Sequence, residues 1–221
     1  MSKPPTTDQL KTGLNDPRAL DILTTEHWSL LSARSLGYQE MFGRATVFIG
    51  ILSGTVIALA LLAQATQFGR QTLSFAAVLF TVSLFIGIAT FVRCVAINLE
   101  DMRWVVGMSL IRRAYLQIAP ELEQFFLASH EPGVDLRTLG YGSPQRFGNL
   151  INSLTTTSSV VAALNSVLAG ALACDAGALA GLALTLSLAI GAGVSLVAAA
   201  LHIRYAARFR RQHDPKAKSP A

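Results

Sequence analysis

The segment Ala45–Gly69, ATVFIGILSGTVIALALLAQATQFG, runs for 25 residues without a charge. A helix needs about 20 apolar residues to cross a hydrocarbon core of about 30 Å. Buried helices of soluble bundles usually keep a polar stripe, and Val47–Ala63 has none. Inside lipid, every backbone N–H and C=O group must be paired within the protein. The segment is therefore predicted to be a transmembrane α-helix.

Three more uncharged runs follow, of 22, 28 and 28 residues: Gln71–Val92, Phe147–Cys174 and Ala176–Ile203. Only 14% of the chain is charged, against about 25% in ordinary soluble domains. This composition excludes both a conventional soluble domain and extensive disorder. The first 44 residues are polar or amphipathic, so no cleavable signal peptide is expected. We predict an all-α membrane protein with transmembrane helices at about 45–66, 72–93, 151–173 and 177–203.

The basic residues predict how the chain is threaded. Of the 18 Lys and Arg residues, 17 lie in the N-terminal arm, the central segment and the C-terminal tail, and only Arg70 lies between the first two spans. Positive charge is retained on the cytoplasmic side of a membrane. We therefore expect two hairpins with very short outer turns, the second at 174–176, and with both termini in the cytoplasm.

The parts outside the spans are predicted to be helical extensions rather than separate domains. Residues 1–15 are expected to form a flexible arm, and Asp16-Pro17 is typical of a helix start. Amphipathic cytoplasmic helices are predicted at 16–44 and 94–128, with a break at Ala119-Pro120. Residues 16–210 then form a single four-span membrane domain, followed by a basic tail at 211–221.

The third predicted span has a small and polar face. Its members repeat at three- and four-residue steps, and five of them are candidates for a pore or for a helix interface: Asn152, Thr156, Ser159, Asn165 and Ser166. Such a face can pack against another helix through hydrogen bonds, or it can line a hydrated path. The sequence leaves both readings open.

Small residues at four-residue intervals mark two other helix faces. Four glycines are candidates for close helix packing: Gly50 and Gly54 in the first span, and Gly177 and Gly181 in the fourth. The partner helix can belong to the same chain or to another copy, so self-association is expected.

Motifs that carry chemistry are missing from the sequence, which contains no P-loop, GxGxxG, HExxH, CxxC or GxSxG pattern. We therefore predict no catalytic residues, no metal site and no cofactor. No ionisable group lies deep inside a predicted span, which disfavours a proton-coupled carrier.

A basic cluster at the C-terminal end is expected to contact anionic lipid head groups rather than nucleic acid: Arg204, Arg208, Arg210 and Arg211.

The stretches Thr25–Leu31 (TEHWSLL), Arg34–Leu36 and Asn98–Trp104 (NLEDMRW) resemble a family of bacterial four-helix membrane proteins without an established activity. The resemblance covers most of residues 19–205 and implies location in a bacterial inner membrane. It implies no mechanism.

The leading functional expectation is a homo-oligomeric pore or channel for ions or small solutes. The polar face of the third span, without buried charge, motivates it. The alternative is a non-conducting scaffold or regulatory subunit, whose amphipathic helices bind a cytoplasmic or membrane partner.

Overall fold

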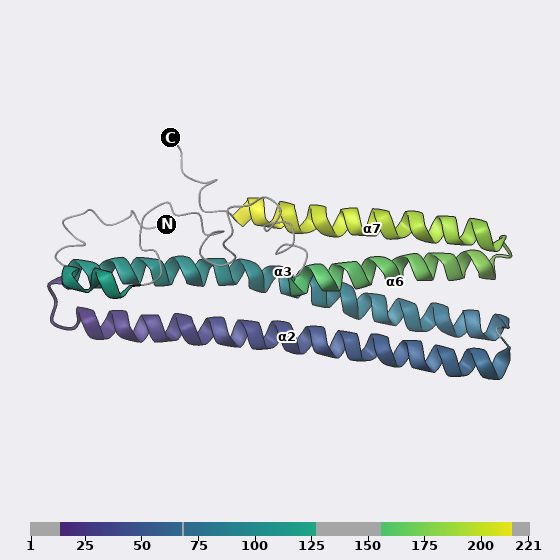
Figure 1. The fold of residues 1–221 in the computed structure, drawn as a ribbon, viewed down its shortest axis with the longest axis horizontal. Helices are drawn as coiled ribbons and strands as arrows, with labels where there is room; N and C mark the ends of the chain where they lie inside the picture. The colour runs from purple at the N-terminus through teal and green to yellow at the C-terminus, as the bar shows by residue number, and fades with distance from the viewer. Residues whose placement is uncertain (1–13, 68, 127–155, 214–221) are drawn as a thin grey trace. The chain divides into compact units, whose positions relative to one another are not determined.

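The computed structural model describes residues 14–67, 69–126 and 156–213, and the side chains of this set up to residue 209. These residues form helices and turns, with no strand among them. In chain order the helices are α2 (Ala19–Thr66), α3 (Arg70–Ile118), the short 3-10 helix η1 (Pro120–Phe125), α6 (Thr157–Leu179) and α7 (Leu184–His213) (Figure 1). The predicted arm at 1–15 and tail at 211–221 lie largely outside the described residues.

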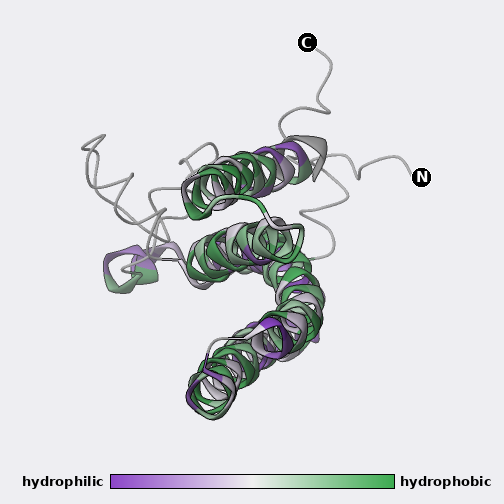
Figure 2. Ribbon diagram, turned by 90° about the vertical axis from the view of Figure 1, so that its right-hand side faces the viewer, coloured by the Kyte–Doolittle hydropathy of each residue, from purple (hydrophilic) through white to green (hydrophobic). Residues whose placement is uncertain are grey.

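Four of these helices, α2, α3, α6 and α7, are long and apolar enough to cross a membrane. The all-helical prediction is confirmed to that extent. Figure 2 shows hydrophobic residues predominating along these helices. Large apolar side chains remain exposed in the single chain, among them Phe85 and Leu196, as expected where lipid replaces water as the solvent.

Helix α2 continues through the start of the uncharged run Ala45–Gly69, and α3 continues past the end of the run Gln71–Val92. Helix α2 is 48 residues long and α3 is 49, and Gly37 and Gly43 both lie within the helical residues of α2. Helix α3 stops before Pro120, which has no backbone N–H to continue an α-helix. The predicted restart after this proline is the six-residue helix η1, in the 3-10 conformation.

The turn between α6 and α7 lies at 180–183, not at 174–176 as predicted. Helix α6 ends with Gly181 at a φ of +82°, a left-handed conformation that glycine adopts without steric cost. The Leu182 amide donates to the Gly177 carbonyl at 3.1 Å and the Gly181 amide to the Ala178 carbonyl at 3.0 Å. This is a Schellman C-cap. The predicted third and fourth spans therefore shift to Thr157–Leu179 and Leu184–His213, and residues 151–155 lie outside the described set.

The chain divides into two compact units, 1–38 with 100–152 and 39–99 with 153–221. In the first unit, α2 and α3 run antiparallel, because their contacts pair in reverse order. The ring of His27 stacks on that of Tyr115 with centroids 6.2 Å apart. Leu30 packs where Gly107 has no side chain. Further along, Arg34 Nε donates to Asp101 Oδ1 at 2.6 Å.

The second unit has a core to which four helices contribute. Phe48 of α2, Phe91 and Val95 of α3 and Val161 of α6 are buried together with Ala45. Ala206 and Phe209 of α7 pack against this cluster. Between α2 and α3, the buried hydroxyls of Thr55 and Ser83 lie 3.1 Å apart and hydrogen bond to each other. Through this core, the face of α6 that carries Asn165 packs against α2 and α3.

Candidate functional site

The polar residues at the start of α6 cap its N-terminus. Thr156 is the N-cap, and its Oγ1 accepts a hydrogen bond from the Ser159 amide at 3.3 Å. The Thr156 and Ser159 hydroxyls also lie 2.9 Å apart. A capping side chain satisfies one of the amides that a helix leaves unpaired at its first turn. Two of the five candidate residues thus have a local structural role.

A hydrogen bond joins this end of α6 to α3. Asn98 Nδ2 donates to Ser158 Oγ at 3.1 Å. Sequence reasoning singled out neither residue as a site. Asn98 lies beyond the predicted second span, and its partner is 60 residues away in sequence. A hydrogen bond of this kind between membrane helices contributes on the order of 1 kcal/mol.

The mid-helix residues of the polar face are buried. Asn165 is 0% exposed and Ser166 is 5% exposed. The Ser166 hydroxyl donates to the Ala162 carbonyl of its own helix at 2.7 Å. Asn152, the remaining candidate, lies outside the described residues. Burial among the candidates in the described part of the chain thus holds for Asn165 and Ser166, whereas Thr156 and Ser159 are partly exposed.

Asn165 occupies a notch in α3 that a glycine creates. A Cβ atom added to Gly87 would collide with Asn165 Oδ1 and would lie 2.7 Å from Cε2 of Phe48. Neither amide atom of Asn165 has a hydrogen-bond partner among the described residues. Leaving a buried amide unpaired costs several kcal/mol relative to water. The close fit against Gly87 and Phe48 shows a packing contact at this point.

Small residues join α6 to α7 at two levels. Gly170 faces Gly191 and Ser195, so that a Cβ on Gly170 would lie 2.5 Å from the Gly191 carbonyl oxygen. Two turns further along α6, a Cβ on Gly177 would lie 2.9 Å from Ser187 Oγ. Glycine at these positions lets the two backbones approach closely.

The four candidate packing glycines therefore have different surroundings. Gly177 lies in the α6–α7 contact and Gly181 lies in the turn. Gly50 and Gly54 lie on an exposed face of α2, where an added Cβ would meet nothing within 4 Å.

Most of the charged side chains that the structure describes in the second unit lie toward one end, which we call the charged end. It comprises Glu40, Arg44, Arg93, Arg204 and Arg208. Arg93 donates to Glu40 from Nε at 2.8 Å and from Nη2 at 2.7 Å, and Arg44 donates to the same carboxylate from Nε at 2.8 Å. These contacts lower the pKa of the Glu40 carboxyl from 4.5 to about 2, with the Arg93 hydrogen bonds as the largest cause.

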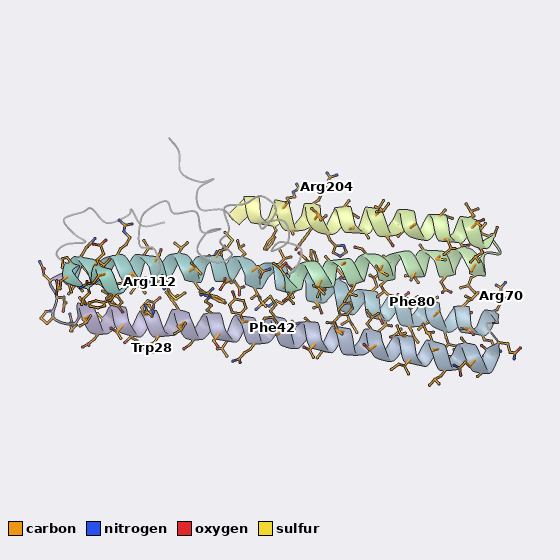
Figure 3. All side chains as sticks on the ribbon, viewed as in Figure 1. Trp28, Phe42, Arg70, Phe80, Arg112 and Arg204 are labelled. Carbon is orange, nitrogen blue, oxygen red and sulfur yellow. The ribbon has the colours of Figure 1, made fainter. Side chains whose placement is uncertain are left out.

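Helix α7 brings its arginines to the same end. Tyr205 contacts Phe91, two residues before Arg93, with ring centroids 5.9 Å apart. Arg204 and Arg208 flank Tyr205 in sequence and are exposed, whereas the side chains of Arg210 and Arg211 lie outside the described set. Figure 3 shows Arg204 and Arg70 toward opposite ends of this unit.

In the described ranges, no three His, Cys, Asp or Glu side chains gather in a way that could hold a metal ion. Cys94 and Cys174 are both free thiols. Comparison with protein-family models, characterised proteins and solved structures found no match to this chain.

Proposed function

We propose that this chain is a helical membrane protein that works as an assembly or regulatory subunit, through contacts of its helices rather than by conduction through a single copy. The observation that carries the proposal is the burial of Asn165 and Ser166. A residue that lines water must be accessible to it, whereas Asn165 packs against Gly87 of α3 and the Ser166 hydroxyl is bonded to the Ala162 carbonyl. The polar face of α6 then serves as a helix interface.

The open face of α2 supports self-association. Gly50 and Gly54 are exposed, and space around both is empty in the single chain. A small-residue face in lipid gains packing energy when another helix covers it. The first unit adds exposed apolar residues on α2, including Trp28 at 63% exposure (Figure 3). Such residues suit a membrane surface or a second protein.

A homo-oligomeric pore for ions or small solutes is the second candidate function. It is favoured by Thr46 and Ser53, which are exposed on the same face of α2 as Gly50. Ser53 lies seven positions after Thr46, about two helical turns, so their side chains point in nearly the same direction. In an oligomer built on this face, these hydroxyls would border the symmetry axis.

The proposed location is a bacterial inner membrane with both termini in the cytoplasm. The charged end then lies on the cytoplasmic side, in line with the positive-inside rule. At the opposite end of the second unit, Arg70 is the basic residue next to the α2–α3 turn.

Light scattering coupled to size exclusion, with the protein in nanodiscs, tests the association. We expect a defined oligomer for the wild-type chain. Gly50→Leu should shift it toward the monomer, because the leucine blocks close approach of a second helix. Gly193→Leu is the matched control, since Gly193 is also exposed with open space around it. A wild-type monomer, or equal effects of both variants, contradicts assembly through α2.

Ion flux from protein-containing liposomes separates the two functions. An oligomer with flux equal to that of empty liposomes supports the assembly subunit. Flux that depends on Thr46 and Ser53 supports the pore and overturns the first proposal.

A further inference from the structure

We propose that Arg44 binds the phosphate of an anionic phospholipid, with Glu40 and Arg93 holding its guanidinium group at the level of the head groups. The proposal needs only that α2 and α3 cross a bilayer. It stands whether or not the protein conducts, and it concerns residues distinct from the arginines of the C-terminal cluster.

The position along the helices is the first step. Arg44 directly precedes the uncharged run Ala45–Gly69, and Arg93 directly follows the run Gln71–Val92. The helical part of the first run, 45–66, and the run Gln71–Val92 each have 22 residues and extend roughly 33 Å at 1.5 Å per residue. This length slightly exceeds the hydrocarbon core of about 30 Å. Both guanidinium groups therefore lie close to the plane of the lipid phosphates.

The charge balance is the second step. Glu40 is one carboxylate between two guanidinium groups, and its pKa of about 2 keeps it ionised at neutral pH. These three side chains together therefore retain a positive charge. Each keeps a third or more of its surface exposed, with Arg44 at 50%. A positive charge held at this depth attracts anionic head groups.

The geometry is the third step. Arg44 Nε and Arg93 Nε each donate to the same oxygen, Glu40 Oε1, at 2.8 Å, so the two nitrogens are at most twice that distance apart. Arg44 uses only Nε in this contact, and both its Nη groups have no partner among the described residues. Two adjacent N–H groups of a guanidinium match two oxygens of a phosphate. The carboxylate thus orients Arg44 in advance of lipid binding.

Arg204 and Arg208 differ from Arg44 in this respect. Both are exposed on α7, and no ion pair to either is found within the described residues. These two arginines attract anionic head groups through their charge, but in the described ranges no carboxylate holds their guanidinium groups in one orientation as Glu40 holds that of Arg44.

The test measures lipid binding to the full-length protein in mild detergent, by native mass spectrometry during titration with short-chain phosphatidylglycerol or phosphatidylcholine. We expect selective retention of phosphatidylglycerol. Arg44→Gln should raise its apparent Kd about tenfold, the change that corresponds to 1.4 kcal/mol. Arg44→Lys, which keeps the charge without the planar fork, should lose part of the affinity. Arg70→Gln, an exposed arginine at the other end of the second unit, is the control and should bind as the wild type does.

Three results overturn the proposal. They are equal retention of both lipids, unchanged affinity in Arg44→Gln, and equal losses in Arg44→Gln and Arg70→Gln. Displacement of the lipid by millimolar inorganic phosphate, lost in Arg44→Gln, would reassign the site to a free phosphate. Thermal unfolding without lipid shows whether a variant is folded, and if Arg44→Gln is not, Arg44→Lys decides.

Discussion

Alanine substitutions at Gly191 and Gly193 should have opposite consequences for stability, although the two residues are two positions apart on α7. Gly191 is buried against α6, and Gly193 is exposed. Both lie inside the helix, so both substitutions bring the same gain in helix propensity, about 0.5–1 kcal/mol. The difference between the two variants therefore isolates the packing of α6 against α7.

The magnitude follows from what the new methyl group would meet. At Gly191 it would lie 2.7 Å from the Gly170 carbonyl oxygen and 3.0 Å from the Cys174 Cβ. The carbonyl belongs to the backbone of α6, so it cannot rotate away as a side chain could. Overpacking of this kind costs about 1–3 kcal/mol. At Gly193 nothing lies within 4 Å, so this variant should be unchanged or stabilised by up to about 1 kcal/mol.

Unfolding in mixed micelles, by titration with a denaturing detergent and detection by circular dichroism, gives the two free energies. Gly191→Ala should be about 1–3 kcal/mol less stable than Gly193→Ala. Equal stability of the two variants would refute the reasoning, because it would mean that α6 and α7 do not approach closely at Gly191.

Three further predictions use the same assay or a thermal one. Gly87→Ala should destabilise the protein by about 1–3 kcal/mol because the methyl group displaces the Asn165 amide, and a wild-type unfolding curve would contradict this. Gly181→Ala should cost about 1–2 kcal/mol, since its φ of +82° is strained for any residue with a Cβ; an unchanged Tm would show that the turn rearranges freely. Glu40 has a folded pKa of about 2 against an ordinary 4.5, so its stabilising contact with Arg93 is present above about pH 4.5 and is lost as the pH falls toward 2. Between pH 6 and pH 3 the Tm should therefore fall further for the wild type than for Glu40→Gln, by an amount limited by the exposure of the pair, and identical slopes would argue against the contact.

The existence and character of the helices could be predicted because lipid leaves the backbone so few choices. A run such as Ala45–Gly69 must pair its backbone groups internally, and the apolar helices are found. The helix ends depend on local backbone conformation rather than on hydropathy. Asp175 interrupts the uncharged sequence and so predicts a turn, yet it is a buried residue within α6. Gly181 ends the helix instead, and a glycine followed by Leu182 is the sequence signal for that cap.

The polar face of α6 shows how far the candidate site can be predicted from the sequence. The sequence shows that Asn165 and Ser166 share a face, but hydrophobic periodicity does not distinguish a wet face from a packed one. That difference depends on Gly87, which lies 78 positions earlier in the chain and supplies the space that Asn165 fills. Gly87 does belong to a series of small residues at three- and four-residue steps, with Ser83, Thr90 and Cys94, but the series does not identify Asn165 as the side chain that it faces. The same holds for Asn98, whose partner Ser158 becomes visible only when α3 and α6 lie together.

Burial of the α6 face also changes where a conducting path would have to run. If an oligomer of this chain conducts, the exposed hydroxyls of Thr46 and Ser53 on α2 are better placed than Ser166, whose hydroxyl is bonded to its own helix. Single cysteines at these three positions, with both native cysteines replaced by serine, test this with a membrane-impermeant thiol reagent in liposomes. In a conducting oligomer we expect labelling at Thr46→Cys and Ser53→Cys, and none at Ser166→Cys because the position is 5% exposed. Labelling at Ser166→Cys alone would return the path to α6, and it would require α6 to leave the contacts with α3 that bury it here.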